Sequence, residues 1–234
     1  MQSLLFGLET DWSPPSTLPD LSQFKEVAID LETYDPLLMS HGPSWAFEGQ
    51  GYVTGIAIAT EKFAIYLPIQ HKGGGNLDKR IVTEWLRKEL AHDNDKIFHN
   101  SLYDLGWLRR IGVHVNGKIH DTMFAAPLID ENQFGYSLNK LGQRYVGEGK
   151  DETLLEEAAR AYKINPKSEM YKLPAAYVGK YAEQDAALTL KLWNILKEGL
   201  VAENVEKIYD LETSLIPILL EMRWKGVPVD TDRA

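Results

Sequence analysis

The stretch Val27–Thr33 constrains the fold of this chain more than any other, because it joins an apolar strand pattern to two acidic residues. Side chains alternate between the two faces of a β-strand, so Asp30 and Glu32 are expected on one face and the apolar residues between them on the other. Two crowded carboxylates repel each other, and one resists ionisation unless a cation lies between them. Oxygen-rich sites of this kind suit Mg2+ or Mn2+. The pattern therefore indicates either a metal site or a strand end that leads into a polar loop.

Composition limits the class of protein. The chain has 234 residues, of which 44% are hydrophobic and 25% charged, which is typical of a globular protein with one large domain or one and a half small ones. It contains no cysteine, which excludes disulfides, thiolate zinc sites and cysteine nucleophiles. No apolar run reaches the length of a membrane span, and the first residues lack the basic region of a signal peptide. We therefore expect a cytoplasmic protein with no membrane partner.

The net charge of −9 argues against a non-specific nucleic-acid binder, which would usually be basic. This objection weakens if several of the acids gather around divalent ions, because bound ions invert the local field.

The remaining sequence predicts strands and helices in a mixed order. Besides the strand at 25–32, we expect strands at 52–59 and 63–69, joined as a hairpin, and short strands at 96–99 and 118–120. Helices are expected at 78–91, 100–110, from 121 onward, 137–146, 151–162, 174–199 and 204–224, with loops at 34–51 and 163–173. Proline should begin the helix at 174 and kink the last helix at 217. These elements predict a three-layer α/β domain with a mixed sheet of about five strands.

Two further segments place carboxylates on helices. Asn100 is expected to cap a helix with its side chain, and Asp104 then lies in the first turn, either to complement the helix dipole or to join a site beside Asp30. Tyr181 and Asp185 are four residues apart and project from one helix face, flanked by alanines that allow close packing. An Asp among apolar positions is costly unless it is paired or bound to a metal.

In order, these segments read Asp-x-Glu on a strand, Asn-x-x-x-Asp at a helix start and Tyr-x-x-x-Asp on a late helix. This triplet resembles the exonuclease motifs of the DEDD superfamily, in its tyrosine-bearing branch, over about residues 25–200. The resemblance implies a ribonuclease-H-like fold and the removal of nucleotides from 3′ ends with two divalent metal ions, Mg2+ or Mn2+. It further implies that Asp30 bridges both ions, that Glu32 and Asp185 hold the ion that activates water, and that Asp104 serves the second ion.

By the same resemblance, Tyr181 would orient the attacking water and Asn100 would contact the terminal nucleotide of a single-stranded DNA 3′ end. His99 lies next to Asn100, but its side chain could as easily cap the strand, so we leave it out of the site.

A second resemblance concerns the C-terminal part. Residues 211–222 and 225–230 are similar to the junction where family A DNA polymerases pass from exonuclease to polymerase domain, and the front loop 35–45 is similar to bacteriophage members of that family. We therefore expect an N-terminal arm at 1–24, a 3′–5′ exonuclease domain at 25–200, and a helical junction at 201–234. The implied partner is a polymerase domain of a longer chain, in which this part proofreads.

Two alternatives remain open from the sequence. One is a free-standing ribonuclease D-like exonuclease that trims RNA, which shares all three motifs. The other is an inactive nucleic-acid-binding module, against which the complete set of carboxylates argues.

Overall fold

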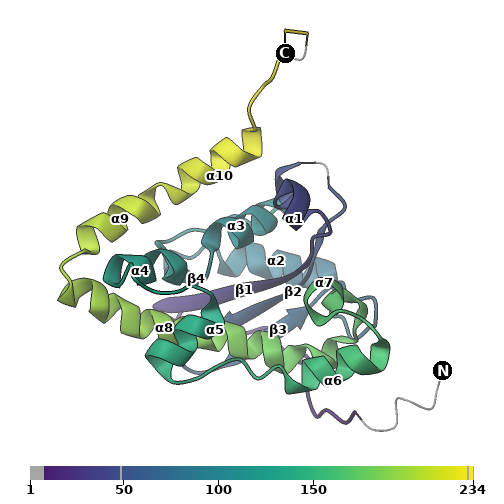
Figure 1. The fold of residues 1–234 in the computed structure, drawn as a ribbon. Helices are drawn as coiled ribbons and strands as arrows, with labels where there is room; N and C mark the ends of the chain where they lie inside the picture. Colours follow the sequence, from purple (N-terminus) through teal and green to yellow (C-terminus); the bar gives the residue numbers. More distant parts are fainter. Residues whose placement is uncertain (1–7, 48, 231, 234) are drawn as a thin grey trace.

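A five-stranded mixed sheet organises the chain (Figure 1). The computed structural model describes residues 8–47, 49–230 and 232–233. The strand order is β3-β2-β1-β4-β5, with β2 antiparallel to both β1 and β3, and β4 parallel to both β1 and β5. The strands are β1 Glu26–Tyr34, β2 Tyr52–Ala59, β3 Ala64–Pro68, β4 Asp95–Phe98 and β5 Ile119–Asp121. The expected hairpin and the mixed sheet are therefore confirmed.

The central strand β1 separates two apolar cores. Val27, Ile29 and Leu31 belong to the core on the side of the helices that follow β3 and β4 in the chain. Ala28 belongs to the core on the opposite side. The period-two alternation read from the sequence is therefore the alternation of the folded strand.

Helices cover both faces of this sheet. They are α1 Leu38–His41, α2 Lys79–Glu89, α3 Ser101–Arg110, α4 Thr122–Ile129, α5 Leu138–Leu141, α6 Thr153–Tyr162, α7 Pro166–Glu169, α8 Gly179–Ala202, α9 Glu206–Ser214 and α10 Ile216–Lys225. Short helical turns occur at Ser44–Ala46, Gly142–Val146, Met170–Lys172 and Ala175–Tyr177. The long helix α8 crosses the sheet and contacts β1, β2, β3 and β4 (Figure 1).

Several expected boundaries are wrong. The long helix begins at Gly179 rather than at Pro174, because the preceding segment forms a separate turn that is tied to a distant loop by a hydrogen bond from the Ala175 N–H to the Gly74 carbonyl (3.0 Å). The last predicted helix is two helices, α9 and α10, rather than one kinked helix. Pro217 lies in the first turn of α10, where its missing N–H costs nothing. The two predicted loops contain the short helices α1 and α7.

The N-terminal arm contacts helices on both faces of the sheet: Trp12 packs onto α8, and the Pro19 carbonyl accepts a hydrogen bond from Trp85 of α2 (2.9 Å). Residues 8–24 contain no helix or strand, and residues 1–7 of the predicted arm lie outside the described residues. The Trp12 ring fills the space beside Gly179, where a Cβ would lie 1.9 Å from the indole. The Trp12 Nε1–H also donates a hydrogen bond to Glu183 (2.9 Å), so the arm is fixed to the first turns of α8.

Trp45 anchors the front loop: its side chain is 1% exposed, so the ring is packed inside the protein and is not free to stack on a base. The ring lies over Gly106, where a Cβ would approach it to 2.0 Å. Glu48, which the same predicted loop contains, lies outside the described residues, as do residues 231 and 234 of the predicted junction.

Within the described ranges, no helix combines the length and apolar character needed to cross a membrane.

Candidate active site

The acidic end of β1 lies under α8. Asp30 pairs in register with Ala57 of β2, and Glu32 pairs with Gly55, so small residues border both carboxylates. The space above Gly55 is occupied by the Tyr66 ring, whose hydroxyl would lie 2.1 Å from a Cβ at that position. A register shift follows directly after Glu32, where the strand leaves the regular ladder. Small residues of β2 therefore border the carboxylates on this face of the sheet, which α8 covers.

Helix α8 supplies the third carboxylate. Ala182 and Ala186 are fully buried against the sheet, and Asp185 between them is 3% exposed. Asp30, Glu32 and Asp185 each offer one carboxylate oxygen, and these three oxygens lie within 4.8 Å of one another. Asp30 and Asp185 are 155 positions apart in the sequence and lie on two different elements. The fold brings them together with Glu32 as one group of oxygen ligands.

Asp104 stands beside this group without belonging to it. It is 4% exposed in the first turn of α3 and is not one of the three residues whose oxygens meet. Burial raises the pKa of Asp104 well above its usual value, and the charges of Asp30, Asp121 and Glu32 raise it further. Asp104 therefore shares the electrostatic field of the cluster without being one of its three grouped ligands.

The expectation that the Asn100 side chain caps α3 is wrong. Asn100 has φ 74° and ψ 55°, and its side chain makes no capping hydrogen bond. The cap is Asp121, whose carboxylate accepts from the N–H groups of Asn100 (3.1 Å) and Ser101 (2.6 Å). The same carboxylate accepts from the Met123 N–H (2.8 Å), as expected for the cap of α4. One buried acid therefore caps two helices, and the exposed Asn100 side chain is left for other contacts.

His99 serves the scaffold. Its Nδ1 shares a hydrogen bond with the Thr122 hydroxyl (2.8 Å). Burial lowers the pKa of His99 to about 4, so the ring is neutral at pH 7. This arrangement agrees with leaving His99 out of the site.

Lys150 is the residue that the sequence did not reveal. Its ammonium forms an ion pair with Asp185 Oδ2 and donates a hydrogen bond to the Tyr181 hydroxyl (3.1 Å). It also lies 5.1 Å from the centre of the Tyr181 ring. Lys150 lies in an irregular segment without hydrophobic periodicity, so no sequence pattern identified it. The only indication was indirect, because an acid on the apolar face of α8 requires a cation as partner.

The carboxylates hold their protons more tightly than exposed acids do. Burial raises the pKa of Asp30 to about 7, and the negative charge of Asp185 adds to the shift while Lys150 opposes it. The pKa of Glu32 is raised well above its usual value, first by burial and then by Asp30 and Asp185. Burial also raises the pKa of Asp185, against the lowering effect of Lys150. This crowding of acids is the electrostatic condition that a bound cation relieves.

Tyr181 remains a hydrogen-bond donor across the neutral range. Burial raises the pKa of its hydroxyl far above the usual value, and the charges of Glu32 and Asp185 raise it further. The group therefore cannot act as a base near pH 7, but it can orient a bound molecule through its hydroxyl. A hollow of about 380 Å³ borders Tyr181 and is also lined by Asp151 and Gln184.

The residues present fit a divalent metal ion. Asp185 Oδ1 is buried and has no hydrogen-bond partner within the described part of the chain. An orphaned carboxylate oxygen beside two other carboxylates is a donor set that suits Mg2+ or Mn2+. The three acids could hold such an ion between β1 and α8.

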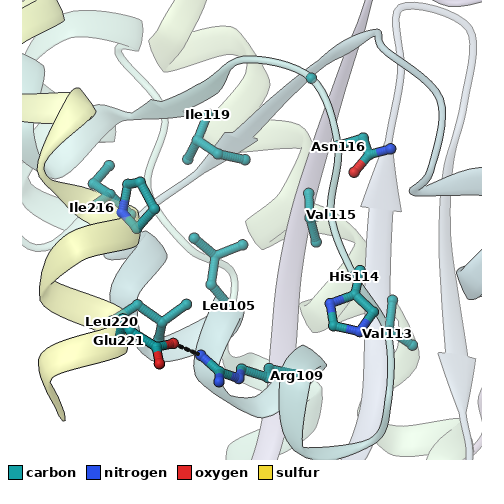
Figure 2. Close-up of a pocket in the computed structure, with 12 residues that line it drawn as sticks. Leu105, Arg109, Val113, His114, Val115, Asn116, Ile119, Ile216, Leu220 and Glu221 are labelled. Carbon is teal, nitrogen blue, oxygen red and sulfur yellow. Dashed lines mark hydrogen bonds and ion pairs between the residues drawn. The ribbon is translucent and has the colours of Figure 1, made fainter. Parts of the chain in front are cut away.

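A larger hollow lies elsewhere. About 560 Å³ of space opens between α3, residues 113–117 and α10, where Arg109 pairs with Glu221 (2.6 Å) (Figure 2). None of the residues that line it is a carboxylate of the cluster. The chemistry is therefore concentrated at the acidic end of β1, and the larger hollow borders the C-terminal helices.

A mixed sheet with this strand order, whose central strand and crossing helix join their carboxylates, defines a ribonuclease-H-like nuclease. The chain matches the 3′–5′ exonuclease family over residues 14–200 and belongs to that family, as the motif triplet predicted. It is accordingly a hydrolytic nuclease domain of the kind found in DNA polymerases.

Individual relatives agree with this assignment. The chain is 40% identical to a DNA-directed DNA polymerase of Pseudomonas phage M6, over 98% of this chain and 36% of that polymerase. It is 29% identical to the DNA polymerase DpoZ of Salmonella phage PMBT28, over 92% of this chain and 33% of that protein. The chain thus spans about a third of the length of each of these two relatives. Among solved structures, Brucella melitensis NrnC with bound Mg2+ superposes with a TM-score of 0.62 at 19% identity, over 92% of this chain and 94% of that one, which shows a shared fold.

Proposed function

We propose that this chain hydrolyses the terminal phosphodiester at the 3′ end of single-stranded DNA with two divalent metal ions, Mg2+ or Mn2+. The observation that carries the proposal is the group of carboxylate oxygens of Asp30, Glu32 and Asp185 within 4.8 Å of one another. The matching relatives are DNA polymerases, which supports DNA as the substrate.

The proposed roles follow the position of each side chain. Asp30, Glu32 and Asp185 would hold one ion, and Asp30 with Asp104 would hold the second. Such ions, when bound, supply a polarised phosphate and an activated water for in-line displacement. The protonated hydroxyl of Tyr181 would orient the attacking water.

Asn100 would contact the terminal nucleotide. Its side chain is exposed at the mouth between β4 and α3, and its left-handed backbone is a conformation that asparagine tolerates better than most residues. Residues held in such conformations often belong to functional sites.

A digestion of end-labelled DNA tests this function. With Mn2+, a 3′-labelled strand should release its label at once as a mononucleotide, whereas a 5′-labelled strand should shorten through a ladder. Chelator should stop both reactions, and Asp185→Asn should abolish them while the variant remains folded. Digestion from the 5′ end, or undiminished cleavage in chelator, would refute the proposal.

The ribonuclease D-like alternative is tested in the same assay with an RNA strand of matched sequence. Faster trimming of the RNA than of the DNA would favour that alternative. An absence of metal-dependent cleavage on both strands would favour an inactive binding module.

We further propose that residues 1–24 form an arm, that residues 25–200 form the exonuclease domain, and that residues 201–234 lead to a polymerase domain of a longer chain. The length of the relatives supports this division. Helices α9 and α10 lie end to end beside α4 and α3 (Figure 1). They carry a row of exposed apolar side chains. These are Ile208, Leu211, Leu215, Ile218, Leu219 and Met222. Such a face is typical of a surface that contacts another part of a protein.

Because the relatives are phage and bacterial polymerases, we also propose that the chain acts in the cytoplasm, of the host cell if its source is a phage.

A further inference from the structure

Lys150 occupies a position that the proposed metal-binding function leaves unexplained. A lysine inside a cluster of metal ligands carries the same sign of charge as the metal, so the two repel each other at short range. We propose that Lys150 is the internal counter-ion of this site: it holds Asp185 in the metal-free protein and competes with the metal for that carboxylate. The inference rests on the proposed metal site at Asp30, Glu32 and Asp185.

The contacts of Lys150 are those of a built-in cation. Its side chain is 17% exposed and that of Asp185 is 4% exposed, so the pair is largely shielded from water. The ammonium takes one oxygen of Asp185, while the other oxygen has no partner among the described residues. The charge of Lys150 also opposes the rise in the pKa of Asp30 and Glu32 that burial causes. A single ammonium thus offsets part of the repulsion among the three acids. The repulsion that remains would be offset by a divalent cation.

The backbone around Lys150 is fixed, which leaves the side chain as the part that moves. The Lys150 N–H donates to Asn139 Oδ1 (3.0 Å), and the Asp151 N–H donates to Gln184 Oε1 (3.0 Å). Gln184 Nε2 in turn donates to the Gly149 carbonyl (3.0 Å). Because Gln184 precedes Asp185 on α8, the segment is anchored next to the ligand. The four-carbon stem of lysine can then swing its ammonium away from Asp185 without a change in the segment.

Competition predicts that removing the charge strengthens metal binding. A hydrogen bond between charged groups has a net worth of about tenfold to hundredfold in an equilibrium constant. The metal must displace this bond from Asp185 in the parent but not in Lys150→Met. We expect the Kd for Mn2+, measured by calorimetric titration of the whole chain, to fall about tenfold, which corresponds to about 1.4 kcal/mol.

Lys191→Met is the matched control. Lys191 also forms an ion pair, with Glu148 of the same segment (2.6 Å), but half of its side chain is exposed and it does not contact the three carboxylates. Its loss should leave the Kd for Mn2+ unchanged. In chelator, Lys150→Met should melt at a lower temperature than both the parent and Lys191→Met, because the acids lose their counter-ion. If Lys150→Met does not fold, Lys150→Gln keeps the polar end and serves in its place.

The outcomes separate the inference from the function beneath it. If the parent binds Mn2+ and the Lys150 variant binds it no more tightly, or if the variant melts in chelator at the parent's temperature, the counter-ion role is wrong and the metal site stands. If the parent binds no Mn2+, or if Asp30→Asn binds it as tightly as the parent, the proposed metal site itself is wrong, and the counter-ion role falls with it.

Discussion

Replacing Asp30 with asparagine should make the metal-free protein more stable, and the gain should depend on pH. The unfolded chain ionises Asp30 near its usual pKa of 3.8, whereas the folded protein keeps the proton until about pH 7. Between these values the folded state binds more protons than the unfolded state, so its free energy of unfolding falls as the pH rises. Asparagine does not ionise and escapes this loss. The variant should therefore match the parent at low pH and exceed it above neutrality.

The size of the gain follows from the pKa shift. A rise from 3.8 to about 7 is about three pKa units, and at about 1.36 kcal/mol for each unit the ceiling is about 4 kcal/mol. Asp30 keeps partial contact with solvent, which screens its interactions, and Lys150 already offsets part of the repulsion. We therefore expect a gain of about 1–2 kcal/mol at about pH 8 and only about 0.5 kcal/mol at about pH 4, where the unfolded carboxyl is about half ionised.

Urea unfolding in chelator, at both pH values, measures this gain. Glu84→Gln is the control, because it makes the same acid-to-amide change at an exposed position of α2 and should alter stability by less than about 0.5 kcal/mol. Added Mn2+ should stabilise the parent, since a ligand bound only by the folded state adds RT ln(1 + [L]/Kd), and it should stabilise Asp30→Asn less. An equal gain at both pH values, or no gain at about pH 8, would refute the electrostatic reasoning.

Three further substitutions test other parts of the structure. Tyr181→Phe should fold normally and bind Mn2+ like the parent, but it should slow single-turnover cleavage roughly tenfold. The loss is smaller than the about 10²–10⁴-fold of a general acid or base, because the substitution removes only an orienting hydroxyl. A rate within about twofold of the parent would contradict this role. Asp121→Ala removes the caps of α3 and α4 and should cost about 1–4 kcal/mol in urea unfolding, at about 0.5–2 kcal/mol for each cap. Gly106→Ala should cost about 1–3 kcal/mol in the same assay, because its methyl group would overlap Trp45; an unchanged midpoint would show that the ring moves aside freely.

Local sequence patterns were sufficient wherever a residue's role depends on its neighbours in the chain. The alternation along β1 separated Asp30 and Glu32 from the core face, and the spacing of Tyr181 and Asp185 placed both on one face of α8. The hairpin of β2 and β3 was visible for the same reason, because its two strands and their connection are contiguous.

Long-range contacts account for what the sequence did not show. Asn100 has the sequence of a helix cap, but the carboxylate of Asp121, from the next strand, takes that role. The start of α8 was misplaced because the segment before it bonds to the loop at Gly74 and because the Trp12 ring occupies the space beside Gly179. Lys150 was missed because its segment has no hydrophobic periodicity and because its partner, Asp185, lies on α8. Each of these contacts joins segments that only the folded chain brings together.

The net charge of −9 poses a question for a protein that acts on a polyanion, and the geometry of the site bears on the answer. Four of the acids, Asp30, Glu32, Asp104 and Asp185, share one field at the end of β1, where burial raises the pKa of each of them. Two divalent ions would bring four positive charges to that point and neutralise the four carboxylates, which would remove their repulsion of a phosphate. The rest of the surface would remain acidic and would repel the strand over distances up to about the Debye length, which is about 10 Å at 0.1 M salt. The attraction between a bound ion and a phosphate acts at short range. It therefore favours a strand whose end has already reached the mouth of the site over a duplex that passes along the surface.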